Sequence, residues 1–111
     1  MKTIRTLYLV RHAKSDWGHE GLKDIDRPLN QRGYDDAYRM SLLMNKKNIR
    51  PSLLVSSPAV RAVSTAYIFA RTMNIAEDKV LIVPSVYESS VAQLKQIISQ
   101  FKDEFQHVML F

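Results

Sequence analysis

The chain of 111 residues contains no cysteine. This absence excludes disulfides, thiolate metal ligands and a cysteine nucleophile, so any covalent chemistry must use another side chain. Long apolar runs are missing as well. The stretch that follows the early cations Lys2 and Arg5 is too short and too strand-like for a signal peptide or a membrane span. We therefore expect a cytoplasmic protein with no membrane partner.

Acidic residues are in the minority: sixteen lysines and arginines stand against eleven aspartates and glutamates, which gives a formal net charge of +5. A net positive charge is typical of proteins that bind nucleic acid, so we consider nucleic acid as a partner. The cations are scattered, however, and only Lys46, Lys47 and Arg50 form a local cluster, near the end of a predicted helix where they complement the helix dipole. We expect no nucleic-acid partner, whereas an anionic substrate met by individual arginines stays open.

Apolar periodicity and turn residues divide the chain into alternating strands and helices within one domain, residues 1–111. Strands are predicted over 3–10, 52–56, 80–83 and 107–111, and helices over about 31–47, 58–74 and 91–101. This β-α-β-α-β-α-β alternation predicts helices packed on a mostly parallel sheet, an α/β fold.

Three of these elements carry more specific predictions. The nearly continuous apolar run of the first strand is typical of a strand buried on both faces of a parallel sheet. Asn30 is a candidate N-cap for the first helix, and Pro58 is expected to open the second. One apolar face of the first helix is expected to be buried, formed by Tyr34, Ala37, Tyr38, Leu42 and Leu43.

Basic residues gather where two strands end. Arg11 and His12 end the first strand, and Arg61 falls in the first turn of the second helix, where backbone N–H groups and a guanidinium can together hold a phosphate. Ligands bind at the carboxyl edge of open α/β sheets. If the first two strands are neighbours in the sheet, Arg11 and Arg61 can flank one anion, with His12 beside it.

These residues resemble the histidine phosphatase superfamily, also called phosphoglycerate mutase-like, in which an Arg-His pair ends the first strand. The second signature of that family, Ser-Pro-x-x-Arg-Ala-x-x-Thr-Ala, matches residues 57–66. The run Arg-His-Ala-Lys-Ser, followed by Trp17 and by Asp-Arg-Pro-Leu at 26–29, is similar to the SixA-type phosphohistidine phosphatase branch. Ala13 stands where many members of the superfamily have glycine. The resemblance implies a three-layer α/β/α sandwich with a mostly parallel central sheet.

The mechanism that the resemblance implies is in-line attack of His12 on phosphorus, followed by hydrolysis of the phosphohistidine by water. Arg11 and Arg61 would neutralise charge on the phosphoryl oxygens. Glu88 is the carboxylate in the position where the family has an acid, able to protonate the leaving group. Lys14 and Ser15 are candidate substrate contacts. The resemblance implies neither a metal nor another cofactor.

Other interpretations of the acidic residues stay open. Glu88 is also an ordinary exposed carboxylate before a helix, where it favours the helix dipole. Asp16, Asp24 and Asp26 are competing acids in the loop after the first strand. Asp16 and Asp24, taken with His12 and His19, offer oxygen and nitrogen ligands for a metal, but their spacing fits no compact ligand pattern.

The expected partner is a phosphorylated protein that carries phosphohistidine, and a small phosphomonoester is the alternative. We expect the protein to be a monomer. A phosphate-binding module without turnover is the competing hypothesis. It is motivated by the second histidine of the family, which follows the fourth strand in a Gly-His motif and is not among these 111 residues. His107 precedes the core of that strand and does not replace it. We expect the sequence to be part of a longer domain.

Overall fold

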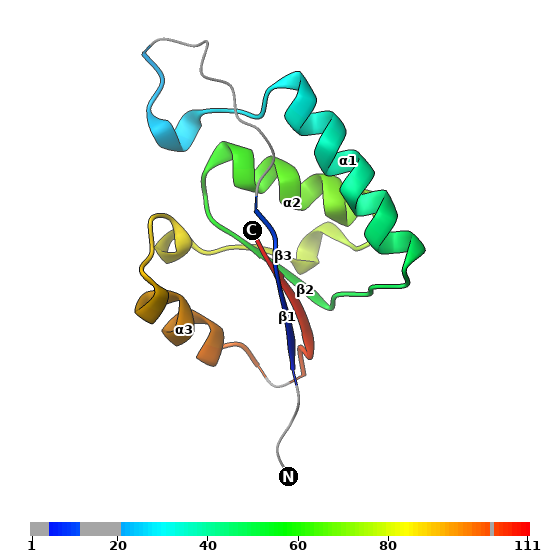
Figure 1. Cartoon of the computed structure of the whole chain (residues 1–111). Coiled ribbons are helices and arrows are strands. Elements are labelled where there is room, and N and C mark those ends of the chain that lie inside the picture. The colour runs from blue at the N-terminus through cyan, green and yellow to red at the C-terminus, as the bar shows by residue number, and fades with distance from the viewer. Residues whose placement is uncertain (1–4, 12–20, 103) are drawn as a thin grey trace.

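The computed structural model of the chain describes residues 5–11, 21–102 and 104–111. Strands and helices alternate as predicted (Figure 1). The strands and helices, in chain order, are β1 (Thr6–Leu9), α1 (Gln31–Lys46), β2 (Leu53–Ser56), α2 (Val60–Thr72), β3 (Val80–Ile82), α3 (Val91–Ser99) and β4 (His107–Leu110). Three short 3-10 turns accompany them: η1 (Asp24–Asp26), η2 (Glu77–Lys79) and η3 (Pro84–Val86).

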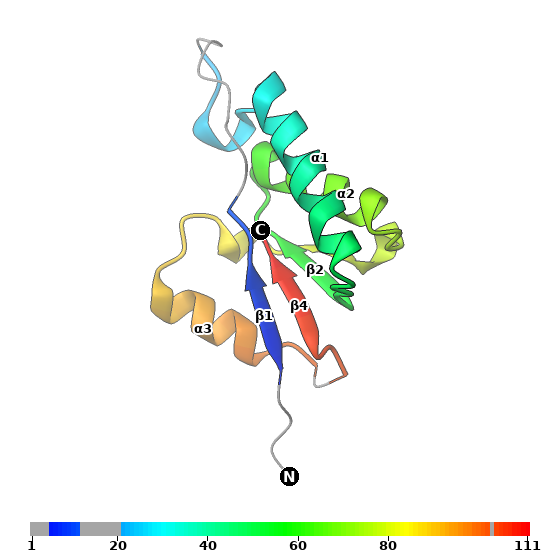
Figure 2. The ribbon, with the colours of Figure 1, turned by 45° about the vertical axis from the view of Figure 1, so that its right-hand side comes forward.

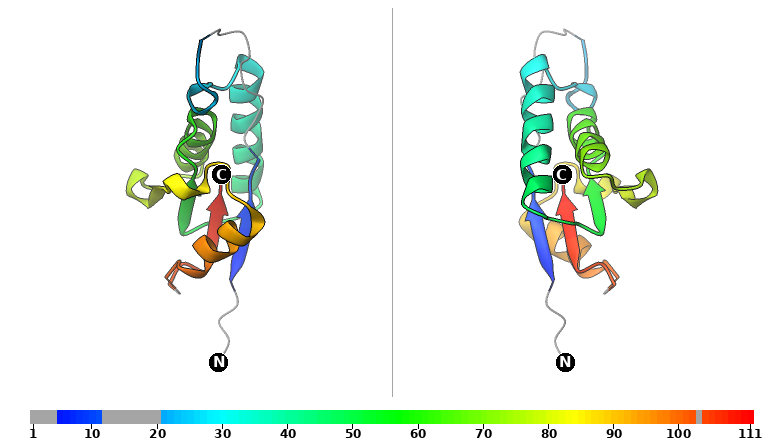
Figure 3. Two further views of the ribbon diagram at one scale, coloured as in Figure 1. Left: turned by 90° about the vertical axis from the view of Figure 1, so that its left-hand side faces the viewer. Right: turned by 90° about the vertical axis from the view of Figure 1, so that its right-hand side faces the viewer.

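The four strands form one parallel sheet in the order β1-β4-β2-β3 (Figure 2). Helices α1 and α2 lie on one side of the sheet and α3 lies on the other (Figure 3). The predicted three-layer α/β/α sandwich is thus confirmed. Because the strands are parallel, their carboxyl ends all reach the same edge of the sheet, and the loops that follow them gather there.

The two faces of the sheet bury different residues of the same strands. Leu54 and Met109 face α2 and pack with Phe69 and Phe111, whose rings meet edge to face at 5.3 Å. The alternate strand positions face α3 and belong to a second cluster, formed by Leu53, Val55, Val108 and Leu110. This alternation is expected for strands covered on both faces. It places the core around β2 and β4.

The prediction that the first strand is buried on both faces is wrong. Within the described sheet β1 lies at the edge, and the side chain of Leu9 is 72% exposed. Leu7 and Leu9 point to the face that α3 covers, but α3 packs over β2 and β4 and does not bury them. The condition that β1 and β2 are neighbours is also wrong, because β4, whose Val108-Met109-Leu110 run is fully buried, lies between them.

The buried face of α1 differs from the prediction as well. Ala37 is buried as expected, but it shares that face with Gly33 and Ser41, four residues apart along the helix. The larger apolar side chains of the predicted face are all exposed, namely Tyr34, Tyr38, Leu42 and Leu43. Helix α1 packs against α2, and small side chains at i, i+4 and i+8 let the two backbones approach closely.

The predicted helix ends are partly confirmed. The Asn30 side chain caps α1 by accepting a hydrogen bond from the Gly33 N–H at 2.7 Å. Pro58, however, does not open α2. The helix begins at Val60 because Ala59 has a non-helical ψ of 134°. The Ala59 N–H donates a hydrogen bond to Ser57 Oγ at 3.1 Å. Within the described part of the chain, no helix combines the length and apolar character needed to cross a membrane.

Candidate functional site

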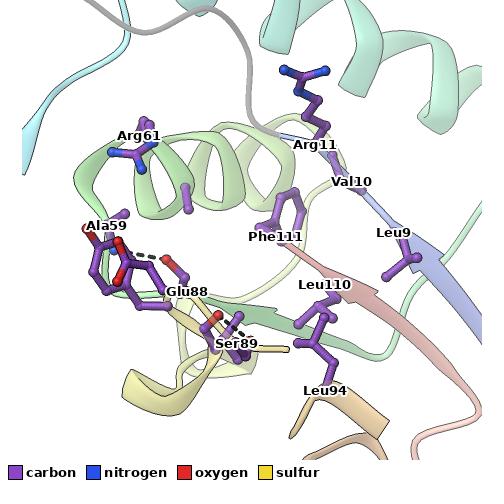
Figure 4. Close-up of a pocket in the computed structure, with 14 residues that line it drawn as sticks. Leu9, Val10, Arg11, Ala59, Arg61, Glu88, Ser89, Leu94, Leu110 and Phe111 are labelled. Carbon is purple, nitrogen blue, oxygen red and sulfur yellow. Dashed lines mark hydrogen bonds between the residues drawn. The ribbon is translucent and has the colours of Figure 1, made fainter. Parts of the chain in front are cut away.

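A cavity of about 480 Å³ lies at the carboxyl edge of the sheet (Figure 4). Residues from the ends of all four strands, or from the loops that follow them, line it. Three of the predicted site residues are among them: Arg11, Arg61 and Glu88. The inner wall is apolar and includes Leu110 and Phe111 at the end of β4. The parallel topology therefore brings side chains from distant parts of the sequence to one hollow.

Arg61 stands in the first turn of α2, as predicted, and its side chain is only 12% exposed. The motif that precedes it sets this position. Ser56 and Ser57 are buried at the end of β2, and the Ser57 N–H donates to the Phe111 carbonyl, which ties the start of the loop to the central strand β4. Among the described residues, no side chain caps the N-terminus of α2. Helix N–H groups and a guanidinium thus lie together at the cavity.

Arg11 lines the cavity just after β1, on the far side of the β4 end from Arg61. Figure 4 shows Phe111 beside Arg11, whose side chain is directed toward α1 and away from Arg61. Arg11 also lines a smaller cavity beside α1, with Asp36 and Thr65 among its neighbours. The interposed strand β4 is the reason for this separation. The two arginines flank the end of β4 rather than following adjacent strands.

Glu88 lies between η3 and α3 on the same side as Arg61 (Figure 4). Its side chain is exposed, and its backbone has a φ of 55°, in the left-handed region. Among the described residues, the other non-glycine residues in this region are Asn48 and Asn74. Asparagine tolerates that conformation, whereas glutamate does so at a cost. Such backbone strain is often found at functional sites.

Asp24 of η1 is the most heavily bonded acid beside the cavity. Its Oδ2 accepts hydrogen bonds from Arg61 Nη2 at 2.9 Å and from the Tyr87 hydroxyl at 2.7 Å. Its Oδ1 accepts from Arg27 Nη2 at 2.9 Å, and its backbone carbonyl accepts from Arg61 Nη1 at 2.6 Å. These donors, with Tyr87 the strongest, hold the pKa of Asp24 well below its ordinary value. A carboxyl group that stays ionised is a poor general acid near neutral pH.

Asp26, the other competing acid that the structure describes, is exposed in η1. Other predicted residues fall outside the described part of the chain. They include the nucleophile candidate His12 and the contacts Lys14 and Ser15, together with Asp16 and His19. Within residues 5–11, 21–102 and 104–111, no three histidine or acidic side chains gather in a manner that could hold a metal ion. His107 lies at the amino end of β4, at the opposite edge of the sheet from the cavity.

Sequence reasoning does not single out Tyr87 or the bonds that Asp24 makes. The sequence marks Asp24 only as one of several acids in the loop after the first strand. It marks Arg27 only as part of the Asp-Arg-Pro-Leu motif at 26–29. Tyr87 offers no signal, because an aromatic residue between two polar stretches is as typical of packing as of a site. Their roles depend on which loops the fold brings together.

Arginines and a carboxylate at the carboxyl edge of a parallel α/β sheet define a protein suited to an anionic ligand. The chain belongs to the histidine phosphatase superfamily (branch 1), whose family model matches residues 7–108. A solved structure of a protein from Agrobacterium tumefaciens assigned as the phosphohistidine phosphatase SixA superimposes with a TM-score of 0.84 at 32% identity. That match covers 94% of this chain and 66% of the other. The structural resemblance to the SixA branch is thereby confirmed.

Two curated proteins are similar to this chain in sequence. A chloroplastic protein of Arabidopsis thaliana with no assigned function is 33% identical over 104 residues, which is 87% of this chain and 48% of that protein. A 2,3-bisphosphoglycerate-dependent phosphoglycerate mutase of Clavibacter michiganensis is 36% identical over 70 residues, 61% of this chain and 28% of the mutase. The chain thus spans half the length or less of these curated relatives.

Proposed function

We propose that this protein removes a phosphoryl group from its substrate through a covalent phosphohistidine on His12. The observation that carries the proposal is the position of Arg61. It is a mostly buried guanidinium in the first turn of α2, in one cavity with Arg11 and Glu88. His12 directly follows Arg11 in the sequence, and Arg11 lines this cavity.

In the proposed reaction the His12 ring nitrogen attacks phosphorus, and the bond to the leaving group breaks as the N–P bond forms. Arg61 and the N–H groups at the start of α2 stabilise the charge on the phosphoryl oxygens from one side, and Arg11 does so from the other. Glu88 gives its proton to the leaving group. It then takes a proton from the water that attacks the phosphohistidine, which releases phosphate and free His12. Lys14 and Ser15 contact the substrate, and the reaction needs no metal.

The proposed substrate is a phosphohistidine on another protein. The similarity to the SixA structure supports this choice, since it extends over 94% of the chain at 32% identity. A small phosphomonoester is the second candidate. The similarity to phosphoglycerate mutase favours it, although that match covers 61% of the chain.

A trapping experiment tests the proposal. The protein is mixed with a chromogenic phosphate ester and quenched in alkali, and the peptide that contains His12 is analysed for acid-labile phosphate by mass spectrometry. We expect a label on His12 in the wild type, and neither label nor turnover in His12→Ala. Full activity of His12→Ala would exclude the mechanism. Phosphate binding with neither label nor turnover in the wild type would instead support a non-catalytic binding module.

The same assay tests the arginine. We expect Arg61→Ala to lower kcat/KM by about 100-fold or more, the loss typical of removing a donor that stabilises transition-state charge. Arg71→Ala is the matched control, because Arg71 is an exposed arginine in the last turn of the same helix. It removes the same charge from α2 at the end away from the cavity. Equal rates in the two variants would contradict the role of Arg61.

A further inference from the structure

We infer that Asp24 is a positioning residue that holds the Arg61 guanidinium in its phosphate-binding orientation; this inference rests on the proposed function. Two bonds join the residues: Nη2 donates to the Asp24 carboxylate at 2.9 Å, and Nη1 donates to the Asp24 carbonyl at 2.6 Å. Two bonds to different nitrogens fix the plane of a guanidinium, whereas one would leave it free to rotate.

Asp24 can serve as an anchor because other groups hold it. Arg27, whose side chain is 10% exposed, donates from Nε and Nη2 to Oδ1 at 3.3 and 2.9 Å. The Tyr87 hydroxyl donates to Oδ2, the oxygen that also accepts from Arg61. The bond to Asp24 raises the pKa of Tyr87, so the hydroxyl keeps its proton and remains a donor. The carboxylate therefore stays in place independently of Arg61.

The bonds of Asp24 also connect separate parts of the cavity wall. Arg61 belongs to α2, and Tyr87 directly precedes Glu88 on the loop between η3 and α3. The Asp24 carboxylate thus fixes the position of Arg61 relative to the loop that carries Glu88, the candidate acid. Such preorganisation matters because misplaced charges at the reacting group lose much of their effect.

The opposite role for Asp24 would be competition, with its carboxylate occupying the place of a phosphate on Arg61. The two roles predict changes of opposite sign. Removing a competing negative charge strengthens anion binding, as does removing any negative charge near an anion site. Removing a positioning group weakens anion binding in spite of the gain in net positive charge. The bonds from Arg27 and Tyr87 favour positioning, because they hold Asp24 in place through groups other than Arg61.

The decisive measurement is the dissociation constant for inorganic phosphate, obtained by calorimetry, together with kcat/KM for the phosphate ester. We expect Asp24→Ala to weaken phosphate binding by about tenfold, the change that corresponds to 1.4 kcal/mol, and to lower kcat/KM at least as much. Asp26→Ala is the matched control. Asp26 is an exposed acid in the same turn whose carboxylate makes no bond to the described residues. It should not weaken binding. Unchanged or tighter binding by Asp24→Ala would overturn the inference.

A double variant distinguishes positioning from a general structural role. If Asp24 acts through Arg61, adding Asp24→Ala to Arg61→Ala should cause no further loss of phosphate affinity. Additive losses would overturn the inference. If circular dichroism shows that Asp24→Ala fails to fold, Asp24→Asn and Tyr87→Phe, which retain the side-chain shapes, take its place. Each of them is likewise expected to weaken phosphate binding.

A wild type that neither binds nor turns over phosphate refutes the proposed function and the inference with it. Normal wild-type activity with an unaffected Asp24→Ala refutes the inference alone.

Discussion

At the scale of single residues, the backbone conformation of Glu88 is strained, because its φ of 55° lies in the left-handed region. Asn48 and Asn74, the other described non-glycine residues with positive φ, end helices α1 and α2, where asparagine in the left-handed conformation is a common stop. Glu88 lies in a loop and has a side chain poorly suited to that conformation. The surrounding loop, anchored through Tyr87 to Asp24, holds it there.

Comparing Glu88→Gly with Glu88→Ala tests this strain. Alanine keeps the steric cost of a positive φ and glycine removes it, so we expect Glu88→Gly to be the more stable by about 1 kcal/mol in free energy of unfolding. Both variants should lose activity if Glu88 supplies the proton. Urea denaturation measures the first effect and kcat the second.

Glu77 provides the control for this comparison. It begins the 3-10 turn η2, where φ is not positive, and it lies away from the cavity. There the order reverses, and Glu77→Gly should be no more stable than Glu77→Ala. Equal stabilities of the two Glu88 variants would show that the left-handed conformation costs nothing at that site.

At the scale of elements, the start of α3 is fixed by reciprocal hydrogen bonds. The Ser90 hydroxyl accepts from the Gln93 N–H at 3.2 Å, and the Gln93 side chain accepts from the Ser90 N–H at 2.8 Å. This capping box follows Glu88 by two residues. None of the nine residues of α3 is fully buried, so its stability depends strongly on the cap.

We expect Ser90→Ala to lower the free energy of unfolding by about 1 kcal/mol, the usual loss for an N-cap serine. Ser99→Ala, in the last turn of the same helix, is the control. Among the described residues its hydroxyl donates only to the carbonyl of Gln96. The loss of that hydroxyl should change the free energy of unfolding by no more than about 0.5 kcal/mol. Chemical denaturation compares the two, and similar losses would show that the capping box is not what stabilises α3.

At the scale of the whole molecule, strand order decides both the core and the site. Because β4 is central, its residue Met109 is completely buried. For the same reason the end of β4 lies between the loops that carry Arg11 and Arg61. The edge position of β1 leaves Leu9 exposed although it belongs to an equally apolar sequence.

The strand order predicts unequal losses from two truncations of similar size. Met109→Ala should lower the free energy of unfolding by about 2–5 kcal/mol, the range for removing a large side chain from a packed core. Leu9→Ala should cost less than about 1 kcal/mol, because most of that side chain is already in water. Thermal or urea unfolding of both variants provides the comparison. Equal losses would contradict the order β1-β4-β2-β3.

Much of the fold could be predicted because its signals are local. The alternation of apolar runs with helical periods gave every described strand and helix to within a few residues, and Asn30 was recognisable as a cap from its side chain alone. The face that α1 buries could not be predicted in this way. Hydrophobicity favoured Tyr38 and Leu42, whereas the close packing of α2 selected Gly33, Ala37 and Ser41.

The amino-acid sequence by itself determined the class of the fold, the family and the family motif that contains Arg61, because these follow from patterns within short stretches of chain. Only the tertiary structure decided that β4 separates β1 from β2, that Arg11 and Arg61 flank its end, and that Asp24 binds Arg61. The physical reason is that strand order and bonds between loops depend on which surfaces pack together across the molecule. Asp24 and Tyr87 are 63 positions apart in the chain, yet one hydrogen bond joins them.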